Sequence, residues 1–237
     1  FGYNEAISSD EHTLSYLVAP SETLWLLMLD SNKYKNNMES NCPNADGAIH
    51  SKTIPWIKKC LKMAEKNNAR VIAVMHHSLL NHNDGNDQNC AIANHEQVLK
   101  LFRKYNVQLT FTGHIHVQHI ASCEKGKYPL YDIATSCLAV YPQKYGILKY
   151  SSTEGFHYRT AQVDLERWAR KNGIPDEEIK RFREYSKNFF SEAALRRAHS
   201  LLHNLSDYSE EEKQFMAETL AALDVEYFQG TLNIHDF

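Results

Sequence analysis

The 237-residue sequence lacks a hydrophobic run long enough to cross a membrane. Its longest uninterrupted apolar stretch is residues 24–29, whereas a transmembrane helix needs about 20 apolar residues. No secretory signal peptide is visible, yet the first residue is Phe1 rather than an initiator methionine. We therefore expect the chain to be processed or excised from something longer, and its cellular location stays undecided.

An excess of positive charge and a paired-cysteine motif are also missing. The net charge is −3, from 26 basic and 29 acidic residues, and the basic residues are scattered, so we expect no nucleic-acid-binding surface. The cysteines include no Cys-x-x-Cys spacing, which argues against a zinc ribbon, and their odd number argues against a disulfide framework. Free thiols are therefore expected at the five positions Cys42, Cys60, Cys90, Cys123 and Cys137.

What the sequence does contain is typical of a globular protein with a sizeable core. Hydrophobic residues make up 43% and charged residues 23% of the chain, and its length suits one large domain or two small ones. Apolar strands and amphipathic helices alternate in the first half, which predicts a layered α/β domain. The predicted strands are residues 14–18, 24–29, 70–75 and 107–112, the predicted helices 52–67 and 94–105, and the predicted loops 33–50 and 81–90.

The pattern changes twice further along the chain. Short strands predicted at residues 117–121, 130–134, 146–150 and 156–163 are expected to form antiparallel hairpins that continue the sheet. From residue 165 onward, apolar residues recur at helical spacing. Ser209 and Glu212 have the spacing of a capping box at the start of the last helix. We therefore predict an α/β domain over residues 1–164 and an all-α appendage over residues 165–237.

Histidines follow two of the predicted strands. His76 and His77 end the strand at residues 70–75, and Gly113-His114-Ile115-His116 follows the strand at residues 107–112. If this second segment is extended, His114 and His116 point the same way, about 6.5–7 Å apart. Imidazoles suit zinc, iron or manganese when carboxylates supplement them. Two such ions clamp a phosphoryl group and generate hydroxide from a bound water.

This order of strand–His, helix and strand–Gly-His-x-His resembles the C-terminal half of the calcineurin-like metallophosphoesterases. The resemblance covers about residues 1–160, and Leu29-Asp30-Ser31, Asp132-Ile133-Ala134-Thr135-Ser136 and Tyr141-Pro142 are similar to bacterial members. It implies the C-terminal half of a two-sheet αββα sandwich, followed here by the helical appendage. It also implies two divalent or trivalent metal ions (Mn, Fe or Zn) and a small phosphate-ester substrate.

The resemblance gives individual histidines a role. His76 and His114 resemble ligands of the second metal, and His116 resembles a ligand of the first. His77 either contacts the phosphate or packs within the sheet, and both interpretations stay open. His82 and His119 have no motif context, so we interpret them as ordinary loop or strand histidines.

The carboxylate motifs of this family are not found. Its Asp-x-His, Gly-Asp and Gly-Asn-His motifs precede the strand-end histidine, and no Gly-Asp dipeptide occurs in this sequence. Asp10-Glu11-His12 matches one motif by letter, but residues 5–9 are not the apolar strand that must present such a ligand. We therefore expect the chain to begin just after these motifs, with the missing N-terminal half of the domain as its partner. The parent protein is expected to hydrolyse phosphate esters, and this chain alone to bind metal weakly and be inactive.

Two other functions compete with this interpretation. A mononuclear metal hydrolase of the amidohydrolase type also ends a strand in His-x-His, but it continues with βα units rather than hairpins. A non-catalytic interaction module would use the helical appendage as its partner-binding part. That appendage could instead form a homodimer contact or cap the active site, with Tyr185, Phe189 and Phe190 as contacts, although its apolar faces are also typical of ordinary core packing.

Overall fold

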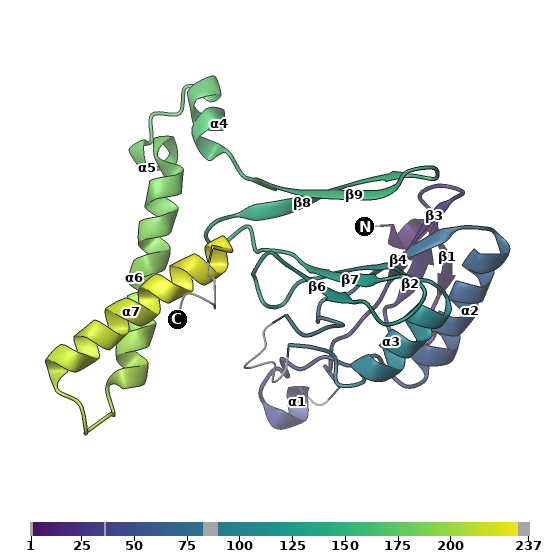
Figure 1. Cartoon of the computed structure of the whole chain (residues 1–237), viewed down its shortest axis with the longest axis horizontal. Helices are drawn as coiled ribbons and strands as arrows, with labels where there is room; N and C mark the ends of the chain where they lie inside the picture. The colour runs from purple at the N-terminus through teal and green to yellow at the C-terminus, as the bar shows by residue number, and fades with distance from the viewer. Residues whose placement is uncertain (1, 36, 83–89, 232–237) are drawn as a thin grey trace. The chain divides into compact units, whose positions relative to one another are not determined.

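The computed structural model describes residues 2–35, 37–82 and 90–231 (Figure 1). The chain divides into two compact units. The first comprises residues 1–115 and 119–135, and the second comprises residues 116–118 and 136–237. The predicted boundary after residue 164 stays a prediction.

The first unit is a seven-stranded mixed sheet with helices. Its strands lie in the order β1-β2-β3-β4-β5-β7-β6. The neighbours β3, β4, β5 and β7 are parallel, whereas β1, β2 and β6 pair antiparallel at the two sides. The elements are a 3-10 turn Tyr3–Glu5, β1 (Ala6–Ser9), β2 (Tyr16–Val18), β3 (Leu24–Met28), α1 (Asn37–Ser40), α2 (Thr53–Lys66), β4 (Arg70–Val74), α3 (His95–Lys104), β5 (Leu109–Thr112), β6 (His119–Cys123) and β7 (Leu130–Ala134).

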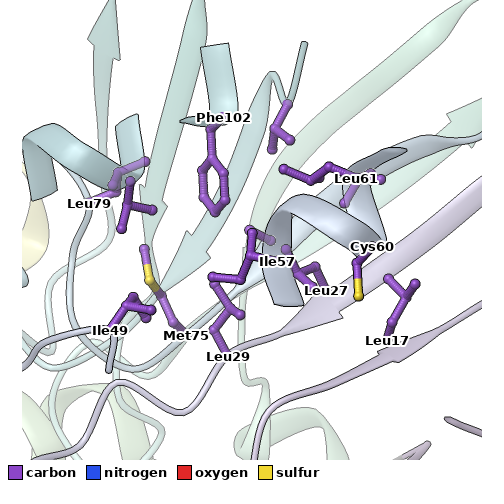
Figure 2. Close-up of a cluster of buried hydrophobic side chains, with 14 of the residues drawn as sticks. Leu17, Leu27, Leu29, Ile49, Ile57, Cys60, Leu61, Met75, Leu79 and Phe102 are labelled. Carbon is purple, nitrogen blue, oxygen red and sulfur yellow. The ribbon is translucent and has the colours of Figure 1, made fainter. Parts of the chain in front are cut away.

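The helices α2 and α3 complete the core of this unit. In α2, Ile57, Cys60, Leu61 and Ala64 are buried at the spacing of one helix face. Phe102 of α3 is fully buried in the same cluster. Figure 2 shows Ile57, Leu61 and Phe102 of these helices in one cluster with Leu27 of β3 and with Met75, which follows β4. Because the core fixes four parallel strands, their carboxyl ends share one edge, where ligands bind in many α/β sheets.

In the part of the chain that the structure describes, the second unit contains a β-hairpin and four helices. Its elements are β8 (Lys144–Ser151), β9 (Gly155–Gln162), α4 (Leu165–Asn172), α5 (Glu177–Lys180), α6 (Phe182–Leu202) and α7 (Glu210–Gln229). The long helices α6 and α7 pack against each other through small buried residues that include Ala194, Ala198, Ala217 and Ala221. The predicted capping box is confirmed, because Ser209 and Glu212 bond to each other's backbone N–H groups.

The predicted α/β class and the helical C-terminal segment are confirmed, whereas two local predictions are wrong and one strand was not predicted. The strands β8 and β9 pair with each other in a separate two-stranded sheet and do not continue the large one. Residues 37–40 form a short helix inside a predicted loop, and residues 6–9 form an edge strand that the apolar pattern did not reveal. In the part of the chain that the structure describes, no helix is long and apolar enough to cross a membrane.

The three aromatic residues predicted as contacts of the appendage differ in exposure. Tyr185 is 38% and Phe189 59% exposed, while Phe190 is 8% exposed. Phe190 packs with Tyr141 and Val225 inside the second unit, so its side chain serves that core. The homodimer and the active-site cap stay predictions, with Tyr185 and Phe189 as the residues that could serve them.

Candidate metal centre

Two parallel strands bring the histidines together. His76 and His77 follow β4, and His114 follows β5, which is the direct neighbour of β4 with Val74 opposite Phe111. Beyond the strands, the pairing continues into the turns: the Gly113 N–H donates to the His76 carbonyl oxygen at 2.9 Å. The turns that carry the imidazoles are therefore joined by backbone hydrogen bonds.

Three imidazoles form a compact group at this edge. His76, His77 and His114 each offer one ring nitrogen within 4.8 Å of the others. His114 Nδ1 lies 3.2 Å from His76 Nε2. The side chain of His76 is exposed, that of His114 half-buried and that of His77 buried. Within residues 2–35, 37–82 and 90–231, no carboxylate belongs to this group.

His77 is held on both of its ring nitrogens. Its Nδ1 lies 2.8 Å from Ser31 Oγ, and its Nε2 lies 2.9 Å from the Ala45 carbonyl oxygen. A carbonyl can only accept, so Nε2–H donates to Ala45, and Nδ1 accepts from the Ser31 hydroxyl. Burial disfavours the charged ring and lowers the pKa of His77. Burial thus favours the neutral imidazole, the ring has direct packing contacts, and the phosphate contact stays a prediction.

A glycine makes room for this buried ring. A Cβ atom on Gly47 would lie only 2.2 Å from Cγ of His77. Ser31 and Gly47 belong to segments tied by the bond from Ala48 N–H to the Ser31 carbonyl oxygen at 2.9 Å. The loop that was predicted only as polar therefore supplies the wall against which His77 packs.

The segment after β5 is a turn, so its predicted extended conformation is wrong. His114 has φ 64° and His116 has φ 59°, both in the left-handed region. The Ile115 N–H donates to the Gly113 carbonyl oxygen at 2.7 Å, which closes a three-residue γ-turn centred on His114. The argument that alternate side chains of a strand point the same way does not apply here.

His116 lies in the second unit, whereas His114 lies in the first. Its exposed side chain lines a cavity of about 350 Å³ together with Tyr141, Gln143 and aromatic residues of α6. Its role as a metal ligand stays a prediction. Asp10, whose motif match was rejected, accepts hydrogen bonds from the hydroxyls of Thr13 and Thr53.

Sequence reasoning named Asp132 only as part of a family-like motif and missed the buried polar group that it forms with His82 and His119. Asp132 lies in the middle of β7 and is fully buried. His82 Nε2 lies 3.3 Å from Asp132 Oδ2, and His82 Nδ1 lies 2.9 Å from Nδ1 of His119. The signal that could have revealed this group is a lone aspartate inside an otherwise apolar predicted strand, because a buried carboxylate requires hydrogen-bonding partners.

Comparison with known families finds a relationship for the helical segment. Residues 164–236 match the model of the C-terminal domain of cyclic nucleotide phosphodiesterase. This match covers less than half of the chain. A search of curated proteins found no match.

Solved structures share a general likeness with the chain. One is a dimetal phosphatase from Danio rerio, with 14% identity and a TM-score of 0.45 over 63% of this chain and 60% of the other. Another is a protein from Staphylococcus aureus assigned as a 5'-nucleotidase, with 11% identity and a TM-score of 0.40 over 79% of this chain and 36% of the other. The chain thus spans less than two thirds of either structure, and neither likeness is close enough to transfer a site.

Proposed function

We propose that this chain carries the histidine part of a dinuclear metal centre in a phosphate-ester hydrolase. The observation that carries the proposal is the group of three imidazoles on neighbouring strand ends. The match of residues 164–236 to a cyclic nucleotide phosphodiesterase domain supports a phosphodiester as the substrate class.

The spacing of two imidazoles suits a shared ion. Two nitrogens that are each about 2.1 Å from a tetrahedral zinc ion lie about 3.4 Å from each other. His76 Nε2 and His114 Nδ1 are 3.2 Å apart. His76 and His114 would therefore hold one ion, and His116 is proposed as a ligand of a second. When bound, such ions supply Lewis-acid activation of the phosphoryl group and of a water molecule.

The chain's own residues set the conditions for that chemistry. Ser31 and Ala45 fix the orientation of the His77 ring, and its burial favours the neutral form, which adds no positive charge beside the ion. Neutral imidazoles alone leave the charge of a cation uncompensated, and mid-series ions in such sites also take carboxylate oxygens. We propose that carboxylates from outside the described histidine group complete the centre, and that without them metal binds weakly and turnover is negligible.

Metal titration tests the histidine assignment. We expect Co²⁺ added to the 237-residue chain to develop a visible absorption band that His76→Ala and His114→Ala each abolish. His157→Ala is the matched control, because this exposed histidine lies on β9 in the second unit. Equal binding by the wild type and both site variants would contradict the assignment.

Hydrolysis and metal content test the class of enzyme. With Mn²⁺ and bis(p-nitrophenyl) phosphate, we expect negligible turnover by this chain and robust turnover by the longest natural chain that contains it. In that longer protein, His116→Ala should lower the rate by orders of magnitude. Robust turnover by the 237 residues alone would contradict the proposal that the metal centre of this chain is incomplete. About two metals per active chain are expected, whereas one would favour the amidohydrolase alternative and none the interaction module.

A further inference from the structure

A single buried carboxylate binds the backbone that follows the histidine pair. The Leu79 N–H donates to Asp132 Oδ2 at 2.7 Å, and the Leu80 N–H donates to the same oxygen at 2.8 Å. Leu79 comes two residues after His77, so these bonds fix the chain as it leaves the histidine pair. Asp132 itself is 0% exposed, which shields these bonds from water.

The other oxygen of this carboxylate binds β5. The hydroxyls of Thr110 and Thr112 donate to Asp132 Oδ1 at 2.6 and 3.2 Å. Thr110 is the register partner of Asp132 on the neighbouring strand β7. Thr112 is the last residue of β5 and precedes His114 by two positions.

One side chain therefore connects both segments that present the imidazoles. We propose that Asp132 is the positioning residue of the histidine group: it sets the distance between the turn after β4 and the turn after β5. The proposal rests on the metal-binding function proposed above. Removing a residue that hydrogen-bonds and positions metal ligands typically lowers the metal affinity by about 10- to 100-fold.

His82 adds a fifth contact to the same carboxylate. Its Nε2 lies 3.3 Å from Asp132 Oδ2, with side-chain exposures of 1% and 0%. This Nε2 makes no hydrogen bond within the part of the chain that the structure describes. Its Nδ1 is paired with His119 at the start of β6. His82 thus lies beside the Asp132 carboxylate, while the four donated bonds do the positioning.

Asp132→Asn tests the positioning role because the amide keeps the size of the side chain but replaces one acceptor oxygen with a donor. We expect the affinity for Co²⁺ alone to fall at least tenfold, with a shifted absorption band. The matched control is Leu130→Ala, a cavity variant of a residue in the same strand that is 1% exposed and whose apolar side chain makes no hydrogen bond to the four donors. It should lose stability and keep the metal affinity. Circular dichroism on the same samples checks that both variants are folded.

Thr112→Val is the second test variant, for use if Asp132→Asn does not fold. It removes the hydroxyl that donates to Asp132 Oδ1 and keeps the branched shape of the side chain. We expect a several-fold loss of Co²⁺ affinity. The metal-free readout is the nuclear magnetic resonance signals of the His76, His77 and His114 rings, which should shift in Asp132→Asn or Thr112→Val and stay in place in Leu130→Ala. No Co²⁺ binding by the wild type would refute the proposed function. Unchanged affinity and ring signals in Asp132→Asn or Thr112→Val would refute the positioning role.

Discussion

The seven-stranded sheet and the α6–α7 pair bury their apolar side chains in different ways. In the sheet unit, large residues such as Leu27, Ile57 and Phe102 are 0% exposed. In the helix pair, the most buried residues are alanines, and Ala217 is 0% exposed while Phe215, two residues before it, is 71% exposed. The stability of the sheet unit therefore depends on large side chains, and that of the helix pair on the close approach of two helices.

The two regions also differ in the polar groups that they bury. The carboxyl edge of the sheet encloses Ser31, His77 and Asp132, each with hydrogen-bonding partners from distant parts of the sequence. The second unit buries Gln143 and Ser186, which contact each other. Hydrogen bonds between buried polar groups help to fix one arrangement of the chain. This difference favours the carboxyl edge of the sheet as the place where functional side chains are held in fixed positions.

Truncation of the sheet core is expected to have the largest effect. Phe102→Ala should lower the free energy of unfolding by about 3–5 kcal/mol, because it removes a fully buried ring and leaves a cavity. Phe215→Ala in α7 is the control and should change it by less than about 0.5 kcal/mol. Urea unfolding of both variants measures the two values. Similar losses in both would show that the two units do not differ as described.

The second-largest effect on stability is expected from adding a Cβ atom beside the buried His77 ring. Gly47→Ala should cost about 1–3 kcal/mol, since the added Cβ would lie 2.2 Å from the ring and force it to move. Gly113→Ala is the matched control, because its Cβ would meet His76 Nδ1 at an ordinary 3.6 Å. Thermal unfolding compares the two variants. An unaltered melting temperature in Gly47→Ala would mean that the ring has more room than its contacts indicate.

The helix pair offers a smaller effect at its capping box. Ser209→Ala should cost about 1 kcal/mol because the hydroxyl accepts from the Glu212 N–H at the start of α7. Ser206→Ala, in the preceding loop, is the control. Urea unfolding followed by helical circular dichroism measures both. A loss equally large in Ser206→Ala would assign the effect to the loop rather than to the cap.

The smallest expected effect is a dependence of stability on pH that arises in the sheet unit. Burial lowers the pKa of His77 in the folded chain below the unfolded value of about 6.5. As the pH falls through that value, the unfolded chain takes up a proton that the folded chain does not, so stability decreases. The loss of stability between pH 7.5 and 5.5 should be smaller in His77→Gln and unchanged in His157→Gln. Identical profiles for wild type and His77→Gln would exclude this contribution.

Periodicity in the sequence was sufficient to find most elements but not their partners. The strand predicted at residues 130–134 matches β7, and the helix at residues 52–67 matches α2 closely, because both show strong apolar patterns. The pairing of β8 with β9 alone could not be predicted, since an alternating pattern does not specify which edge a strand joins.

The same limit applies to the candidate site. The family resemblance assigned His76 and His114 to one metal ion, and their ring nitrogens lie 3.2 Å apart. Their role as ligands stays a prediction. The hydrogen bonds of His77 with Ser31 and Ala45 join residues far apart in the sequence. The same is true of the hydrogen bond that Asp132 accepts from the Leu79 N–H. The turn at His114 depends on a local hydrogen bond that the apolar pattern does not encode.

The left-handed backbone at His114 and His116 also restricts which amino acids can replace these histidines. Branched and bulky side chains are strongly disfavoured in this conformation, while Asn, Asp and His adopt it more readily than other non-glycine residues. Oxygen and nitrogen donors of these three types are also metal ligands. Apart from glycine, substitutions that the backbone tolerates at these positions are therefore drawn mainly from ligand-bearing residues, and conformational constraint alone favours the retention of coordinating chemistry in this turn.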